Sequence, residues 1–291
     1  MPLTDLVRYL NARNRARYQL PADAQDGLRI ATGTAQGRIL GRFADLSLDS
    51  AFQPIIELRH GRVVGHEALL RARSDQGCDL SPEVVFVLPT DAQEIVYLDR
   101  LARTVHALNF LQQPAQTGGL LYLNVHPRHL LAVGSDHGLV FEEILRRCGL
   151  SPDQVVMEIL ESEVEDLAPL KDAIANFRSR GYRIAIDDFG RGHANLDRVW
   201  ELAPDIVKLD RRLIATGSTD RRIRAVLPKL VDVLKAQGAQ VLFEGIENPD
   251  HLDLAHESGA DLVQGYLLGR PAASCRPIGQ SGMPQPEPIA A

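Results

Sequence analysis

The sequence predicts an α/β fold, a single (β/α)8 barrel, on two observations. Short β-branched runs alternate with longer amphipathic segments about seven times, which is the pattern of parallel strands joined by crossover helices. The alternation occupies about 225 residues, a length that fits one barrel better than two domains. A doubly wound open sheet gives a similar alternation and is the alternative fold.

The strands and helices are expected in alternating order along the chain. The expected strands are Phe52–Leu58, Arg62–Leu70, Leu120–His126, Val155–Glu161, Arg183–Phe189, Asp205–Asp210, Val241–Ile246 and Leu262–Leu267. The expected helices include Asp91–Leu111, Leu139–Cys148, Glu163–Arg180, Ala194–Leu202, Arg221–Gln237 and Asp250–Ser258. The connection Leu58–Gly61 is too short for a helix, so the first two strands should pair as an antiparallel hairpin.

Composition and charge exclude several classes of protein. With 45% hydrophobic and 24% charged residues, the chain is expected to fold rather than to be disordered. No apolar run reaches the roughly 18 residues that a membrane span needs, and no apolar h-region follows the Arg-rich N-terminus, so the protein is expected to be cytoplasmic. The net charge of −6 argues against binding to a nucleic-acid polymer. Three widely spaced cysteines, Cys78, Cys148 and Cys275, support neither a disulfide framework nor a zinc site.

Both ends of the chain lie outside the alternation. Residues 1–45 carry seven arginines and no lysine and are expected to form an N-terminal extension to which the sequence assigns no role. Residues 273–291 contain four prolines and no apolar periodicity, and are expected to be a loose tail. The barrel is therefore expected over residues 46–272.

Polar side chains fall near the carboxyl end of each of seven successive strands. They are Glu67, Asn124, Glu158, the pair Asp187 and Asp188, Lys208 with Asp210, Glu244, and Gln264. In a parallel barrel these ends converge on one mouth, where active sites of this architecture lie. A single residue of this kind is usually ordinary surface at a strand exit, but the whole set is better explained by a site.

The carboxylates gathered at one mouth would repel one another unless positive charge lay between them. Oxygen ligands without cysteine or an obligatory histidine favour Mg²⁺ or Mn²⁺, and the set predicts a two-metal hydrolytic site. Asp187 and Asp188 can face one cluster only if the strand ends between them, which the glycines of the following loop permit. The alternative is that Asp188 only accepts hydrogen bonds from loop amides.

The stretch His66–Arg71, with the sequence HEALLR, resembles the signature of the EAL-domain phosphodiesterases that hydrolyse cyclic di-GMP. The other motifs of that family follow in order between Ser47 and Pro271. They are LNV at 123–125, EILE at 158–161, DDFG at 187–190, VKLD at 207–210, EGIE at 244–247 and QGYLLGRP at 264–271.

The resemblance implies a modified TIM barrel with an antiparallel first strand, and a role for each matched residue. One metal ion would be held by Glu67, Asn124, Glu158 and Asp187, and the second by Asp187, Asp188 and Glu244. Lys208 would contact the attacking water or the scissile phosphate, and Glu244 occupies the position of the proposed general base. Asp188 belongs with these two to the catalytic set. Substrate would contact Leu70, Arg71 and Gln264, and the supporting residues would be Glu161, Asp210 and Glu247.

Several positions depart from the family pattern. Arg191, His193, Ala194 and Asn195 stand where relatives usually have Thr or Ala, Tyr, Ser and Ser. His126 replaces a common serine and Phe243 a common alanine. None of these departures removes an expected ligand, so regulation and turnover rate are the properties they should affect. For Glu161 a local alternative exists, because Ser162 and Glu165 can form a capping box and leave Glu161 exposed.

The implied reaction is hydrolysis of cyclic di-GMP to linear pGpG by a metal-activated water, with two Mg²⁺ or Mn²⁺ ions, in a protein expected to be a homodimer. The main alternative is a receptor that binds cyclic di-GMP without cleaving it and signals through a partner. A more distant alternative is a metal-dependent barrel enzyme acting on enolates, which also uses a lysine and carboxylates at strand ends.

Overall fold

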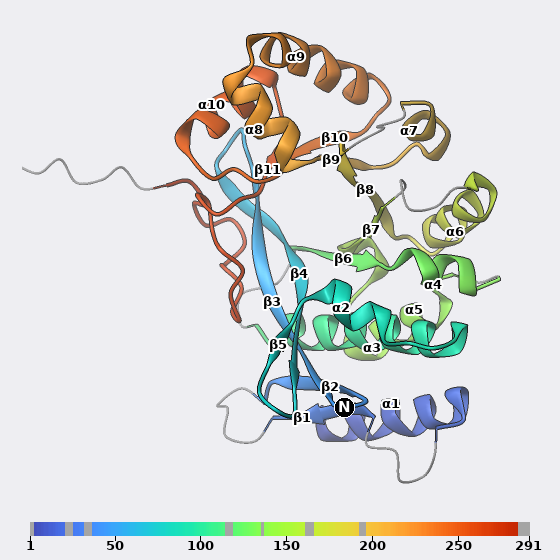
Figure 1. Cartoon of the computed structure of the whole chain (residues 1–291). Coiled ribbons are helices and arrows are strands. Elements are labelled where there is room, and N and C mark those ends of the chain that lie inside the picture. The colour runs from blue at the N-terminus through green and yellow to red at the C-terminus, as the bar shows by residue number, and fades with distance from the viewer. Residues whose placement is uncertain are drawn as a thin grey trace, which may run out of the picture.

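The computed structural model describes residues 3–20, 26–31, 37–113, 119–134, 137–160, 166–191 and 196–284. Eight strands form a closed barrel, because the first of them pairs with both the second and the last. In chain order these strands are β3 (Leu46–Glu57), β4 (Arg62–Ser74), β6 (Leu120–Val125), β7 (Val155–Ile159), β8 (Arg183–Phe189), β9 (Ile206–Leu209), β10 (Gln240–Phe243) and β11 (Leu262–Val263). Figure 1 shows the long β3–β4 hairpin with the shorter strands beside it.

The direction of β3 distinguishes this barrel from a regular one. β3 pairs antiparallel with β4 on one side and with β11 on the other, whereas the pairs from β4 through β11 are parallel. The predicted barrel with an antiparallel first strand is therefore confirmed. Closure through β3 excludes the open doubly wound sheet.

The helices lie outside the barrel and follow the strands along the chain (Figure 1). They are α1 (Leu3–Tyr18), α2 (Pro82–Val87), α3 (Ala92–Leu111), α4 (Pro127–Ala132), α5 (Leu139–Cys148), α6 (Leu167–Ser179), α7 (Leu196–Leu202), α8 (Arg211–Thr219), α9 (Arg221–Ala236) and α10 (Pro249–Ser258), with a 3-10 turn at Pro152–Gln154. Within the described residues, no helix has the length and apolar character needed to cross a membrane.

The expected elements are present, mostly with shorter ends. Two strands expected to reach Ile246 and Leu267 end at Phe243 and Val263, where the chain turns toward the barrel mouth. The helix expected from Glu163 begins at Leu167, where Asp166 accepts a hydrogen bond from the backbone N–H of Ala168. The sequence analysis did not predict the short helices α2, α4 and α8.

The barrel interior has two layers, an apolar one below and a polar one above. The apolar layer is Ile55, Tyr122, Val156, Ala185, Ile206, Leu242 and Leu262. Successive residues of a strand face opposite sides, so the residue two positions further on points inward as well. Two positions after Tyr122, Val156 and Ala185 come Asn124, Glu158 and Asp187, and the same step leads to Lys208, Glu244 and Gln264. The period of the strands thus places the polar set directly above a packed apolar floor.

Gly65 shows how closely this floor is packed. A Cβ atom at Gly65 would lie 2.7 Å from the carbonyl oxygen of Leu120 and 3.0 Å from the ring of Tyr122. Tyr122 is fully buried. A residue without a side chain at position 65 therefore makes room for the largest ring of the interior, two positions before Glu67.

Three further strands extend the barrel sheet, and helix α1 packs beside them. β2 (Ile39–Phe43) pairs with β3, β1 (Gly27–Ile30) pairs with β2, and the two-residue β5 (Asp79–Leu80) pairs with β4. α1 contacts β1 and α5, and Arg13 of α1 forms an ion pair with Glu143 of α5.

Residues after the barrel return along the hairpin. Ala272 pairs with Phe52, the backbone N–H of Gly279 donates to Val63, and that of Gly282 donates to Gly61. The segment expected to be a loose tail is described up to residue 284. Within that part, Gly279 and Gly282 make these hydrogen bonds to the hairpin. The domain limits at 45 and 272 stay predictions.

A buried polar cluster joins α3 to the first strands. His106 Nδ1 lies 2.8 Å from the hydroxyl of Ser50 on β3. The side chain of Asn109 accepts from the backbone N–H of Ile39 on β2 and donates to its carbonyl oxygen. Burial, with a smaller effect from the nearby Arg71 guanidinium, lowers the pKa of His106 to about 3.

We predict that His106 makes stability fall on acidification. Below its ordinary pKa near 6.5 the unfolded chain takes up a proton that the folded chain does not bind until about pH 3, so this group costs about 2 kcal/mol at pH 5. Urea unfolding of the wild type and His106→Gln at pH 7 and pH 5 measures the effect. The variant should lose less stability between the two pH values, and an unchanged difference would contradict the prediction.

Candidate active site

The polar layer is organised around the ammonium group of Lys208, which is 1% exposed. Its Nζ lies 2.7 Å from Glu158 Oε1, 2.8 Å from Glu244 Oε1 and 2.9 Å from Asp187 Oδ1. Glu67 Oε2 is at 3.7 Å. Four carboxylates from four strands or strand ends therefore surround one buried cation.

Two amide side chains complete this arrangement. Asn124 Nδ2 donates to Glu67 Oε1 at 3.1 Å and to Glu158 Oε2 at 3.3 Å. Gln264 Nε2 donates to Glu67 Oε2 at 2.8 Å. Each amide leaves its carbonyl oxygen as a further possible ligand beside the carboxylates.

Burial and mutual repulsion shift the protonation of these groups. Burial raises the pKa of Glu158 well above its usual range, and the nearby Glu67 carboxylate raises it further. Burial also raises the pKa of Glu244 to about 8, although Lys208 opposes the shift. For Lys208, burial would lower the pKa, but Asp187, Glu158 and Glu244 outweigh it and raise the pKa above its ordinary value. One ammonium group is thus too little positive charge for the carboxylates around it.

Asp187 and Asp188 reach the same site because the pairing of β8 with β9 is irregular at these two residues. The register shifts between Ile186 and Phe189, and Asp188 has a positive φ of 55°. Contrary to the expectation from the sequence, the strand does not end between the two aspartates, because β8 continues to Phe189. A bulge reorients Asp188 instead. The Asp188 carboxylate accepts a hydrogen bond from the guanidinium group of Arg191 at 2.8 Å.

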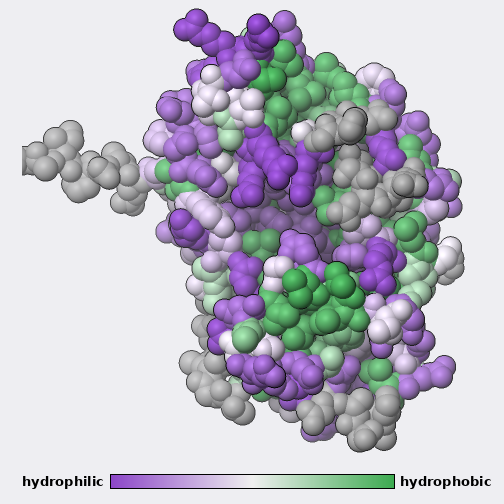
Figure 2. Space-filling model, in the orientation of Figure 1, coloured by the Kyte–Doolittle hydropathy of each residue, from purple (hydrophilic) through white to green (hydrophobic). Residues whose placement is uncertain are grey.

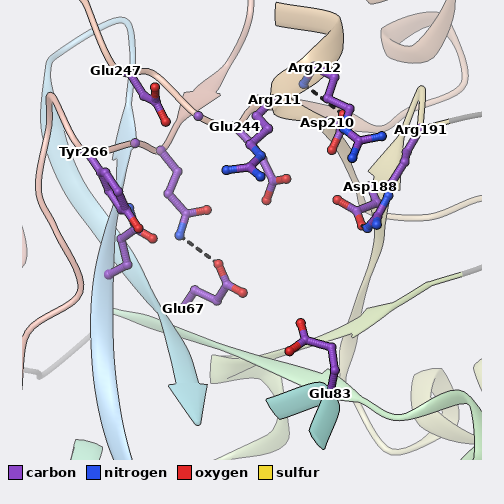
Figure 3. A pocket seen from close by; sticks show the side chains of 14 residues that line it. Glu67, Glu83, Asp188, Arg191, Asp210, Arg211, Arg212, Glu244, Glu247 and Tyr266 are labelled. Atoms are coloured by element: carbon purple, nitrogen blue, oxygen red, sulfur yellow. Dashed lines mark hydrogen bonds and ion pairs between the residues drawn. The ribbon is translucent and has the colours of Figure 1, made fainter. Parts of the chain in front are cut away.

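A pocket of about 350 Å³ opens above the polar layer. It lies in the hydrophilic hollow on the face seen in Figure 2. Figure 3 shows Glu67 and Glu244 at the pocket, with Asp188 and Arg191 on one side and Tyr266 on the other.

The structure brings together eight of the residues expected at the site. They are Glu67, Asn124, Glu158, Asp187, Asp188, Lys208, Glu244 and Gln264. Asp210 and Glu247 also line the pocket, and Asp210 accepts a hydrogen bond from the backbone N–H of Arg212 at the start of α8. The functional roles of all these residues stay predictions.

Three expected residues are not part of this group. Arg71 is exposed, donates to the carbonyl oxygen of Leu70, and does not line the described pocket. Leu70 is buried. Glu161 lies outside the described residues, as do His193, Ala194 and Asn195.

The sequence analysis missed several pocket residues. They are Gln53, Glu83, Arg211, Arg212 and Tyr266, and Arg191 was noted only as a departure from the family pattern. For Gln53 a signal existed. Because β3 runs in the opposite direction, its polar inward residue precedes the apolar floor residue Ile55 by two positions instead of following it.

The donor set fits divalent cations. Oxygen atoms of Asp187, Asp188 and Glu244 lie within 4.8 Å of one another. Carboxylate and amide oxygens are the ligands that hard cations such as Mg²⁺ prefer. The partly compensated charge around Lys208 is a second reason, since a divalent cation would stabilise the ionised form of these carboxylates.

Comparison with known proteins identifies the family of this chain. A family model of the EAL domain matches residues 38–271, so the chain belongs to the EAL domain family. The cyclic di-GMP phosphodiesterase RocR of Pseudomonas aeruginosa is 28% identical over 273 residues, which cover 92% of this chain and 67% of RocR. The EAL-domain protein YkuI of Bacillus subtilis is 31% identical over 228 residues, which cover 76% of this chain and 54% of YkuI.

Solved structures show the same fold. The complex of Klebsiella pneumoniae BlrP1 with calcium and cyclic di-GMP superposes with a TM-score of 0.71 at 25% identity, over 96% of this chain and 68% of BlrP1. The YkuI complex with calcium and cyclic di-GMP has a TM-score of 0.67 at 27% identity, over 79% of this chain and 57% of YkuI. The chain spans 35%, 43% and 67% of the length of curated relatives from Azorhizobium caulinodans, Escherichia coli and P. aeruginosa.

We predict that Lys208→Met destabilises the protein when divalent cations are absent. The substitution leaves Glu158, Asp187 and Glu244 without their shared cation, and breaking a buried charge pair costs about 3–5 kcal/mol. Thermal unfolding in EDTA should show a large fall in Tm, and added Mg²⁺ should raise the Tm of the variant more than that of the wild type. Lys229→Met, at an exposed lysine of α9, is the control and should change neither value. Equal Tm values for Lys208→Met and the wild type in EDTA would contradict the prediction.

Proposed function

We propose that this protein hydrolyses cyclic di-GMP to linear pGpG. The observation that carries the proposal is the gathering of Glu67, Glu158, Asp187 and Glu244 around Lys208 at the base of an open pocket. Membership of the EAL domain family supports it. So do the relatives named as cyclic di-GMP phosphodiesterases and the BlrP1 and YkuI complexes with that nucleotide.

Two divalent cations, Mg²⁺ or Mn²⁺, belong to the proposal. Glu67, Asn124, Glu158 and Asp187 would hold one, and Asp187, Asp188 and Glu244 the other, with Asp187 shared. When bound, such ions lower the pKa of water and stabilise charge on phosphoryl oxygens. A BlrP1 structure with manganese and cyclic di-GMP, 26% identical to this chain, is consistent with this choice of ions.

The side chains of the protein supply proton transfer and orientation. Glu244 lies at the pocket and is placed to accept a proton from the attacking water. Burial raises its pKa to about 8, and bound cations would lower that pKa and favour the ionised form that accepts the proton. Lys208 keeps its proton and holds Glu158, Asp187 and Glu244 in place. By giving up one of these three contacts, its ammonium group can donate to an oxygen of the scissile phosphate. Gln264 and Asn124 orient Glu67. Leu70 and Arg71 stay proposed substrate contacts, and Glu161, Asp210 and Glu247 proposed supporting residues.

The direct test is product formation. Purified protein incubated with cyclic di-GMP and Mg²⁺ or Mn²⁺ should yield pGpG, detected by chromatography, and EDTA should stop the reaction. Binding of cyclic di-GMP without product in either metal would contradict the proposed hydrolysis and support the receptor alternative.

We predict that Glu244→Ala abolishes turnover while the fold is kept. The carboxylate is at the pocket and only partly exposed, so its removal takes away both a proton acceptor and a ligand without opening the apolar floor. The pGpG assay should show a loss of at least about 100-fold, the lower range for a positioned acid or base. Asp232→Ala, at an exposed carboxylate of α9, should retain wild-type turnover. Normal turnover by folded Glu244→Ala would refute the role.

A further inference from the structure

The pocket has charge of opposite sign on its floor and on one wall. Carboxylates form the floor, whereas three arginines line the wall formed by the ends of β8 and β9, namely Arg191, Arg211 and Arg212. Figure 3 shows Arg211 directed toward the pocket beside Glu244, and Arg212 beside Arg191. This wall is on the opposite side of the pocket from Tyr266.

The three arginines differ in their partners. Arg191 Nη1 lies 2.8 Å from Asp188 Oδ2 and forms an ion pair with it. The guanidinium groups of Arg211 and Arg212 have no hydrogen-bond or ion-pair partner within the described part of the chain. Two cationic groups therefore face the pocket without a direct ion-pair partner among the described residues.

The backbone that carries Arg211 and Arg212 is held firmly. Both residues begin α8, where Asp210 is buried and its Oδ1 accepts a hydrogen bond from the N–H of Arg212 at 2.9 Å. Gly245 has a positive φ of 64°, and a Cβ there would lie only 2.3 Å from the Cβ of Arg211. The loop that carries Glu244 thus packs directly against Arg211. This contact holds Arg211 at a fixed position relative to Glu244.

We infer that Arg211 and Arg212 bind the second phosphate of the substrate, the one that is not cleaved. This inference rests on the proposed function. A cyclic dinucleotide has two phosphodiester groups, and when one lies over the carboxylate floor the other must lie elsewhere in the pocket. A guanidinium group matches the oxygens of a phosphate and always carries its charge. The wall therefore selects substrates with two phosphates over those with one.

The site on Arg211 and Arg212 is separate from that expected for Arg71. Arg71 is on β4, and its guanidinium group donates to the carbonyl oxygen of Leu70. Arg211 and Arg212 follow β9, which is separated from β4 in the sheet by β8, β7 and β6, and both residues line the pocket.

The test compares two ligands that share both guanines. Cyclic di-GMP has two phosphodiester groups, and the dinucleoside monophosphate GpG has one. Equilibrium binding of each is measured with Ca²⁺ present, the cation in the YkuI and BlrP1 complexes with cyclic di-GMP, so that the carboxylate floor is neutralised, for the wild type, Arg211→Ala, Arg212→Ala and the double variant. Arg221→Ala, at an exposed arginine of α9 outside the pocket, is the matched control.

The double variant should bind cyclic di-GMP about tenfold or more weakly, as expected for lost charge-assisted hydrogen bonds, and GpG with nearly unchanged affinity. Arg221→Ala should bind both ligands like the wild type. Equal weakening for both ligands would mean that the arginines contact the guanine bases, and unchanged binding of both would mean that they contact neither group. Either result overturns the inference.

Turnover of the wild type separates this failure from failure of the proposed function. A wild type that forms pGpG, together with variants that keep their preference for cyclic di-GMP, refutes only the arginine wall. A wild type that neither binds nor cleaves cyclic di-GMP refutes the proposed function and the arginine wall together.

Discussion

The buried ammonium group of Lys208 among four carboxylates is the interaction on which the geometry of the site depends. Each carboxylate comes from a different strand or strand end, so the lysine joins β4, β7, β8 and the residue after β10 at one point. Its charge only partly compensates theirs, as the raised pKa values of Glu158 and Glu244 show. The same arrangement that holds the site together therefore leaves negative charge that further cations could neutralise.

The apolar floor directly below the carboxylates makes their uncompensated charge more costly, because it keeps water away from them. Charged groups so far from solvent are costly to bury, and the closed barrel provides the packing that compensates for them. Tyr122, Val156 and the other floor residues are buried and form one apolar cluster directly below the carboxylates. Fold and site are therefore specified by the same alternation of inward and outward residues.

This alternation also explains how much the sequence alone revealed. The parallel strands followed from β-branched runs that alternate with amphipathic segments. The position of polar residues near the carboxyl ends of those strands then brought Glu67, Glu158 and Lys208 to one site correctly. Gln53 was not predicted because its strand is antiparallel to the others. The bulge that turns Asp188 was not predicted because strand periodicity does not indicate bulges. Glu83, Arg211 and Arg212 come from short helices, which are too brief for a recognisable helical period.

The reversal of β3 has a further consequence for how the chain is threaded. In a regular barrel the first strand begins at the closed bottom and ends at the catalytic rim, so preceding residues join far from the chemistry. Here β3 starts on the rim side and descends, with β2 paired to Leu46–Leu48 before the strand reaches Gln53. The N-terminal segment is thereby attached to the open end of the barrel by one uninterrupted strand that also lines the pocket.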